Sequence, residues 1–240
     1  MKPVILLLVA AATIGAAPAR PAHRAAPAPR YEAGGFEPFW ELVIDHGRLH
    51  YDPRNGTAVV DMATPPRRAV RNGYRLVSRD IIVDVRHIRC DAEWGRTFVD
   101  TVRISGRRAF HAVGCGGMGI APADLNYSFW NIRNVAGTQF PEDSDDWRIE
   151  FEEGRIKITA RCQQYSGTYR ERRPALTLSA LTHVAPPGCV DHQGLSAPTQ
   201  LALERRVLAI MQGRLQMRFI QGDTLVLTGP GGSIRLFPAP

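Results

Sequence analysis

Lysine is almost absent from this 240-residue chain. Lys2 and Lys157 are the only two, so nearly all of the 30 basic residues are arginine, against 23 acidic residues. The net charge of +7 would suit a nucleic-acid partner. The arginines, however, fall in scattered pairs such as Arg67-Arg68 and Arg107-Arg108, with no interleaved aromatic stripe. We therefore expect a solvated basic surface and no specific nucleic-acid partner.

Long apolar runs are missing after the first residues. The apolar run at residues 4–12 precedes Ala17 and Ala19, which place small residues where a signal peptidase reads them. This run is shorter than the ~20 residues that a membrane span needs. The sequence therefore predicts a signal peptide at residues 1–19 and a soluble periplasmic or secreted protein without a transmembrane segment. No cysteine lies near the cleavage point, so we do not expect a lipoprotein.

Catalytic and metal-binding motifs are scarce as well. The chain has no HExxH pair, no nucleophile elbow and no second ligand pair to complement Cys189 and His192. Residues 114–119 satisfy the spacing GxGxxG, but Ile-Ala-Pro follows where a dinucleotide-binding fold needs a helix. We interpret these glycines as a turn at the end of a domain. We expect no cofactor, no metal and no enzymatic activity.

Cysteine occurs at four positions, and in an exported chain an even number indicates disulfides. Three pairings are possible for four cysteines. We predict Cys90–Cys115 and Cys162–Cys189, because each pair then lies within one half of the chain. Each bond closes a loop of about 25 residues, which stabilises the fold by roughly 3 kcal/mol if the effect is chain entropy.

Short strand patterns fill both halves of the chain. An Ala/Pro leader at residues 20–30 precedes β-branched and aromatic segments separated by glycine turns, up to residue 119. Residues 120–126 are the best internal boundary, and residues 127–240 repeat the pattern. The sequence predicts a mainly β protein with two small barrel-like or sandwich-like domains in series, the second with one α-helix packed on its sheet.

Individual elements follow from turn residues and apolar spacing. Glu153-Gly154 is typical of a tight hairpin turn, and helical spacing occurs at residues 196–212, with Gly213 as the stop signal. The expected strands are at residues 39–45, 48–51, 57–60, 81–88, 98–104, 109–113, 129–135, 147–151, 156–160, 167–169, 176–181, 215–220, 224–227 and 233–237.

The second half resembles the META domain (HslJ-like) family. The resemblance begins at Phe129-Trp130-Asn131-Ile132 and is most specific at Cys162-Gln163-Gln164-Tyr165-Ser166-Gly167-Thr168-Tyr169. Gln163 stands where the family usually has asparagine. Thr182 and Cys189 match a later threonine and cysteine of the family. The resemblance implies a stress-response protein of the periplasm or outer membrane, without a catalytic reaction.

The first half resembles an uncharacterised family of exported bacterial proteins. Its motif is Glu-Pro-Phe-Trp, present here as Glu37-Pro38-Phe39-Trp40, and the segment from Cys90-Asp91 to Cys115-Gly116 also fits. Phe36 replaces a more usual threonine. This resemblance implies no reaction either.

The motif residues are the candidate site residues. Trp40 and Trp130 can serve as core residues or as aromatic ligand platforms, and core packing is the commoner role. The remaining candidates, with a structural or a binding role, are Glu37, Pro38, Phe39, Tyr165, Ser166 and Gly167.

We expect a non-enzymatic exported protein that acts in envelope stress or integrity by binding a partner, either an envelope protein or a cell-wall component. Two alternatives stay open at this point. One is an inhibitor of an exogenous hydrolase such as lysozyme. The other is an enzyme that acts on cell-wall material, which would require an exposed polar cleft with a perturbed carboxylate.

Overall fold

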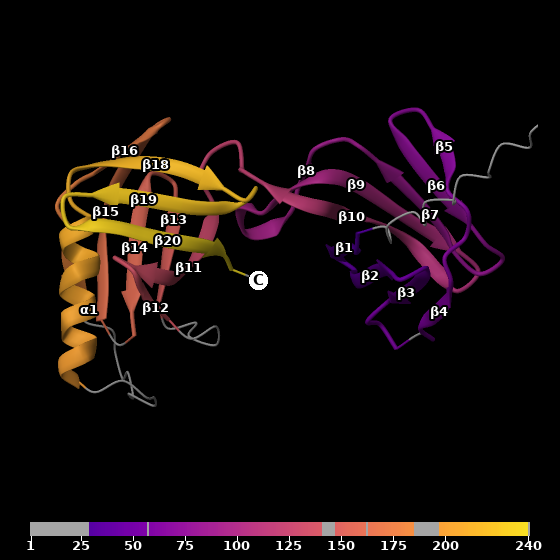
Figure 1. Cartoon of the computed structure of the whole chain (residues 1–240), viewed down its shortest axis with the longest axis horizontal. Coiled ribbons are helices and arrows are strands. Elements are labelled where there is room, and N and C mark those ends of the chain that lie inside the picture. Colours follow the sequence, from indigo (N-terminus) through magenta and orange to yellow (C-terminus); the bar gives the residue numbers. More distant parts are fainter. Residues whose placement is uncertain (1–28, 57, 141–146, 162, 185–196, 240) are drawn as a thin grey trace, which may run out of the picture.

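The chain forms two β domains in series, and the described part contains one α-helix (Figure 1). The structure, a computed structural model, describes residues 29–56, 58–140, 147–161, 163–184 and 197–239. The predicted fold class is confirmed, and each domain is built as a barrel, one half-open and one closed. The predicted signal peptide lies outside the described residues, as do Cys162 and Cys189.

The first domain is a ten-stranded antiparallel sheet curled into a half-barrel. Its order is β4-β3-β2-β1-β10-β9-β7-β6-β5, with β8 paired to β9 and the 3-10 turn η1 (Glu93–Gly95) after β8. Its strands are β1 (Tyr31–Phe36), β2 (Phe39–Asp45), β3 (Arg48–Asp52), β4 (Val60–Ala63), β5 (Arg68–Val70), β6 (Gly73–Val77), β7 (Ile82–Arg86), β8 (Cys90–Asp91), β9 (Thr97–Gly106) and β10 (Ala109–Ile120).

The glycines at residues 114–119 lie within β10, so their predicted role as a terminal turn is wrong. A Cβ atom on Gly114 would lie 2.1 Å from the carbonyl oxygen of Gly34 and 2.6 Å from Cζ2 of Trp40. The segment is therefore rich in glycine because β1 and an indole ring press against it. Strand β1 was not predicted, since its Ala-Gly-Gly sequence has no strand propensity of its own.

The second domain is a closed eight-stranded barrel. Strand β11 pairs with β13 on one side and with β20, from the end of the chain, on the other. The eight strands of the ring are β11 (Ser128–Val135), β13 (Trp147–Glu152), β14 (Arg155–Ala160), β15 (Gln163–Arg172), β16 (Ala175–Leu178), β18 (Arg214–Ile220), β19 (Thr224–Gly229) and β20 (Gly232–Pro238). Two short strands lie outside the ring: β12 (Thr138–Gln139) pairs with β11, and β17 (Thr182–Val184) pairs with β15.

Helix α1 (Ala197–Ile210) packs against β11, β19 and β20, on the side of the barrel away from the first domain (Figure 1). Val207, Ile210 and Met211 place their side chains in the barrel core. The predicted helix is thus confirmed, and Gly213 follows it with a φ of +63°, a left-handed conformation that favours glycine. No helix in the described ranges is long and apolar enough to cross a membrane.

The two domains touch at glycine positions of the first domain, where a side chain would not fit. A Cβ atom on Gly95, in η1, would lie 2.4 Å from Cβ of Ser128 at the start of the second barrel. A Cβ atom on Gly119, near the end of β10, would lie 2.3 Å from a carboxylate oxygen of Asp223. These close approaches bring η1 and the end of β10 against the second barrel.

Candidate functional site

The Glu-Pro-Phe-Trp motif forms the hairpin turn between β1 and β2. Glu37 and Pro38 are the two exposed turn residues, joined by a cis peptide bond, and Phe36 pairs with Phe39 beside them. Side chains alternate along a strand. Trp40 is therefore buried, with 1% of its surface exposed, whereas Phe39 is 52% exposed. The motif thus supplies one core residue and one surface residue.

Trp40 stacks over Gly35, its partner on the opposite strand. A Cβ atom on Gly35 would lie 2.2 Å from the indole Nε1, so only glycine fits beneath the ring. The Nε1 atom is buried and has no hydrogen-bond partner among the described residues. A buried donor without a partner is uncommon in folded proteins, and a ligand or water is one explanation.

A third exposed aromatic residue joins the motif from a distant segment. The ring of Trp94, in η1, lies 4.9 Å from that of Phe36 in an edge-to-face arrangement, and Phe36 lies 6.1 Å from Phe39. Their exposed fractions are 42% for Phe36, 52% for Phe39 and 39% for Trp94. We refer to Phe36, Phe39 and Trp94 as the aromatic tip.

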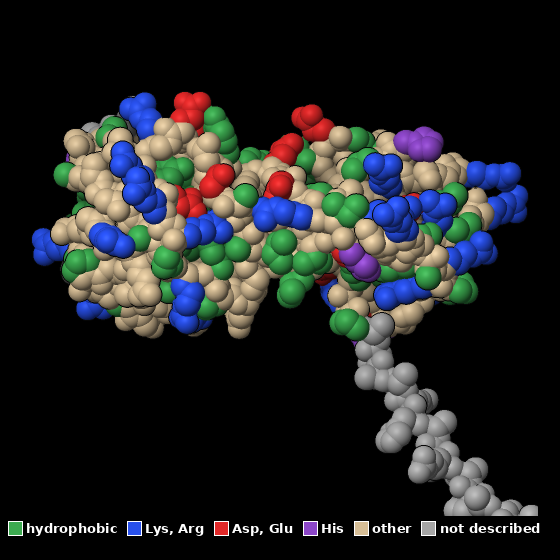
Figure 2. Space-filling model, turned by 90° about the horizontal axis from the view of Figure 1, so that it is seen from above, with side chains coloured by type: hydrophobic (Ala, Val, Ile, Leu, Met, Phe, Trp, Pro, Cys, Tyr) green, Lys and Arg blue, Asp and Glu red, His purple; other side chains and the backbone are tan. Residues whose placement is uncertain are grey.

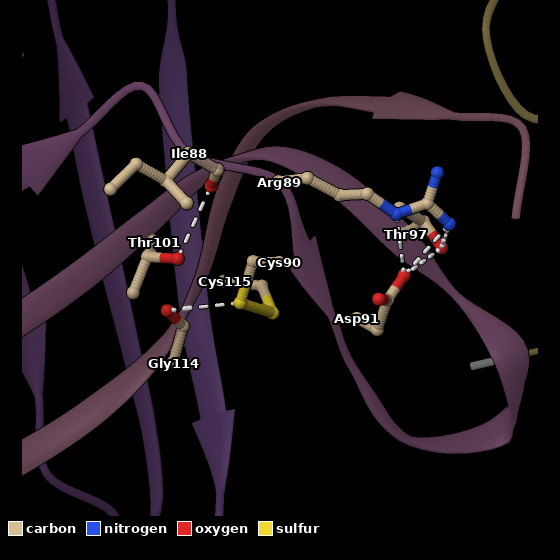
Figure 3. The surroundings of a disulfide bond; sticks show 8 residues. All are labelled: Ile88, Arg89, Cys90, Asp91, Thr97, Thr101, Gly114 and Cys115. Carbon is tan, nitrogen blue, oxygen red and sulfur yellow. Dashed lines mark hydrogen bonds and ion pairs between the residues drawn. A yellow bond between two sulfur atoms is a disulfide. The ribbon is translucent and has the colours of Figure 1, made fainter. Parts of the chain in front are cut away.

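The loop that carries Trp94 is fastened at its base (Figure 3). A disulfide joins Cys90 to Cys115 of β10, as predicted. Asp91 accepts hydrogen bonds from Arg89, at 3.1 Å, and from the Thr97 hydroxyl, at 2.8 Å. These two bonds hold the pKa of Asp91 below its ordinary value. The loop therefore leaves and re-enters the sheet at fixed points.

The aromatic tip borders a cleft of about 460 Å³ that reaches the second domain. Trp40 and Arg96 line this cleft, and the Nε atom of Arg96 is a second buried donor without a partner. Glu93 and Asp223 contribute carboxylates to its lining. Within the described residues, Glu37 and Glu93 have no basic partner. The cleft therefore offers aromatic surface, unpaired donors and acidic groups.

The candidate residues of the second domain lie elsewhere and serve its packing. Trp130 is 1% exposed in the barrel core, and its Nε1 donates a 2.7 Å hydrogen bond to the Ser128 hydroxyl. The Tyr165 hydroxyl donates to Glu204 of helix α1. Burial, and then this hydrogen bond, raise the pKa of Tyr165 to about 12. Tyr165 therefore ties the helix to the barrel.

Ser166 and Gly167 follow on the same strand, β15. Ser166 pairs with Lys157 and with Thr182, and its side chain is half-buried. A Cβ atom on Gly167 would lie 3.0 Å from the Ser179 hydroxyl. The structure therefore does not bring these two residues to the cleft.

Sequence reasoning missed Phe36, Trp94 and Arg96 as members of the site. Trp94 lies within the short turn η1 (Glu93–Gly95) and Arg96 directly follows it, and this turn carries no periodic pattern. Only the predicted Cys90–Cys115 bond placed this turn near β10. In the described ranges, no three His, Cys, Asp or Glu residues gather to hold a metal ion.

Comparison with known proteins bears on the second domain. The family model described as "META domain" matches residues 123–240 and does not extend to the Glu37–Trp40 motif. No curated protein matches the chain. One solved structure, titled "NMR structure of the protein", covers 45% of this chain and 86% of its own length, with 16% identity and a TM-score of 0.36. The similarity to a known family therefore concerns residues 123–240, which resemble the META domain.

Proposed function

We propose that this is a non-enzymatic exported protein of the cell envelope that acts in stress response or integrity by binding a protein partner. The observation that carries the proposal is the aromatic tip beside two unpaired buried donors. Exposed aromatic residues next to a partly polar cleft are typical of protein interaction sites. The Cys90–Cys115 bond supports export, because disulfides persist in oxidising compartments.

The chemistry of the cleft favours an extended protein segment as the partner. The Trp40 and Arg96 N–H groups need acceptors, and backbone carbonyls of a bound segment would provide them. Phe36, Phe39 and Trp94 would pack against its apolar side chains. The unpaired carboxylates of Glu37 and Glu93 favour a basic segment, although the protein as a whole carries a net charge of +7.

This local acidity also favours the second candidate function, an inhibitor of a cationic hydrolase such as lysozyme. A positively charged surface argues against a cationic target, but Glu37 and Glu93 add carboxylates without a basic partner beside the tip, where Arg54 lies over the Phe39 ring. Purified protein would then slow lysis of a cell-wall suspension by lysozyme. Loss of that effect in Phe39→Ser would place the contact at the tip, and no inhibition by the wild type would exclude this function.

Photo-crosslinking tests the leading proposal. Phe39 is replaced by p-benzoylphenylalanine, and Val113, which is 56% exposed on β10 outside the cleft, is replaced in the same way as a matched control. Irradiated cells should give a protein adduct from position 39 and none from position 113. A second substitution, Trp94→Ser, should reduce the adduct from position 39. Equal adducts from both positions, or none from position 39, would contradict the proposal.

A further inference from the structure

A second polar cluster of the first domain lines a hollow other than the cleft beside the aromatic tip. Tyr31 opens β1, Tyr74 lies near the start of β6, and His87 directly follows β7. Asp100 of β9 lies between them and is only 4% exposed. With Arg67 these residues line a hollow of about 920 Å³, and we refer to the five as the polar mouth.

Two glycines of β10 make room for the polar mouth. A Cβ atom on Gly116 would lie 2.7 Å from the hydroxyl of Tyr31, and one on Gly117 would lie 2.9 Å from a carboxylate oxygen of Asp100. Larger residues at either position would push these polar groups out of the barrel. The glycine-rich segment of β10 therefore shapes the polar mouth.

The acceptors of the polar mouth are already occupied. The Tyr31 hydroxyl donates to one oxygen of Asp100 at 3.1 Å, and Nδ1 of His87 donates to the other oxygen at 2.8 Å. The remaining carboxylate of the hollow, Glu32, is paired with Arg30. Both oxygens of Asp100 are therefore already hydrogen-bonded within the hollow.

Two donors of the polar mouth, by contrast, are free. The Arg67 guanidinium lies over the Tyr74 ring, 4.5 Å from its centroid, and has no carboxylate partner among the described residues. The Tyr74 hydroxyl is buried and has no hydrogen-bond partner there. Burial raises the pKa of Tyr74, so its hydroxyl keeps its proton at neutral pH. Both groups can donate to one bound oxygen-bearing anion.

The walls of the hollow are apolar on one side. Val99 and Met118 line it, and Met118 is 64% exposed, an unusual position for a large apolar side chain. Mouths of β-barrels are common places for small ligands, which are held by apolar walls and a few placed polar groups.

We propose that the polar mouth binds a small amphiphilic anion, with its carboxylate or phosphate head on Arg67 and Tyr74 and its apolar portion along Val99 and Met118. This site goes beyond the protein-binding function proposed above and uses different polar side chains. The head could belong to a free carboxylic acid or to a phosphate-bearing lipid, and the experiment separates the two.

Calorimetric titration of the full mature chain tests this site with three ligands of equal chain length: octanoate, octyl phosphate and octyltrimethylammonium. We expect one or both anions to bind and the cation not to bind. Octanoate alone indicates a carboxylate ligand, and octyl phosphate alone indicates a phosphate head. Binding of neither anion, or equally tight binding of the cation, would overturn the proposal.

Two variants and one control variant locate the ligand. Arg67→Gln should weaken binding about tenfold, the loss of one charge-assisted hydrogen bond. Arg68→Gln removes the same charge one residue away, outside the hollow, and should leave the affinity unchanged. Tyr74→Phe should weaken binding several-fold without lowering the melting temperature of the free protein, because its hydroxyl has no partner to lose. If Arg67→Gln and Arg68→Gln weakened binding equally, net charge alone would explain the loss of affinity, and the proposed site would be wrong.

Discussion

The Cys90–Cys115 bond provides the sharpest test of how the first domain is held together. The two cysteines are 25 residues apart. Their bond links β8 to β10, and both of these strands pair with β9. Closing a loop of this length stabilises the folded state by about 3 kcal/mol, because the unfolded chain loses conformational freedom. The bond also fixes the base of the loop that presents Trp94 to Phe36.

The perturbation is the double variant Cys90→Ser/Cys115→Ser, which removes the bond without leaving a free thiol. Unfolding entropy is about 2 cal/mol/K per residue, so a loss of about 3 kcal/mol in a domain of about 90 residues lowers its melting temperature by roughly 15 °C. Differential scanning calorimetry should show this shift in the transition of the first domain. Reduced wild-type protein should melt near the same temperature as the variant.

The matched control is Cys162→Ser, which removes the other predicted bond and should lower only the transition of the second domain. The reasoning would be refuted if the double variant melted within about 3 °C of oxidised wild type, since loop closure predicts a larger change. Peptide mapping that found Cys115 linked to Cys162 would refute it as well.

Three further predictions concern packing and titration. Gly35→Ala should lower the free energy of unfolding by about 1–3 kcal/mol, because the new Cβ would overlap the indole of Trp40. The control Val113→Ala, at an exposed position, should lower it by less than about 0.5 kcal/mol, and denaturant titration measures both. Tyr165→Phe should destabilise the second domain by about 1–3 kcal/mol, because it leaves the carboxylate of Glu204, 9% exposed, without its donor; a melting temperature equal to wild type would contradict this. Absorbance at 295 nm should show little tyrosinate at pH 10–11 in the folded protein, since burial and nearby carboxylates raise the pKa to about 12 for Tyr51, Tyr165 and Tyr169. Because each folded pKa exceeds the unfolded value near 10, the protonated phenols stabilise the folded state fully below pH 10, and this contribution is lost between about pH 10 and 12. Titration of these tyrosines at their ordinary pH near 10 would contradict their burial.

The net positive charge of the protein does not describe its local charge distribution. Arginine and lysine side chains are spread over both domains on the face in Figure 2, between tan and green atoms, rather than joined in one band. The groups that matter for the two proposed sites are local exceptions: unpaired carboxylates at the aromatic tip and an unpaired guanidinium, Arg67, at the polar mouth. Net charge alone identifies neither.

Much of the second domain could be predicted because its elements are encoded locally. The turn at Glu153-Gly154, both with positive φ, joins two strands that the alternation of apolar residues already outlines. The helix near residues 197–210 follows from apolar spacing in the same way. These features depend on residues close together in the chain, so a single sequence is enough to show them.

Tertiary structure alone decided how the first domain and its sites are assembled. Strand β1 exists because β2 and β10 provide its hydrogen bonds, although its own Ala-Gly-Gly sequence has no strand propensity. The glycines of β10 are explained only by the indole and backbone atoms that approach them from other strands. Trp94 contacts Phe36, and Arg67 contacts Tyr74, because of how the strands pair. No periodic pattern in the sequence indicates either contact. The sequence pattern determines which segments form strands, because a strand that buries one face alternates apolar and polar residues. Long-range packing decides which strands pair and which side chains are left without hydrogen-bond partners.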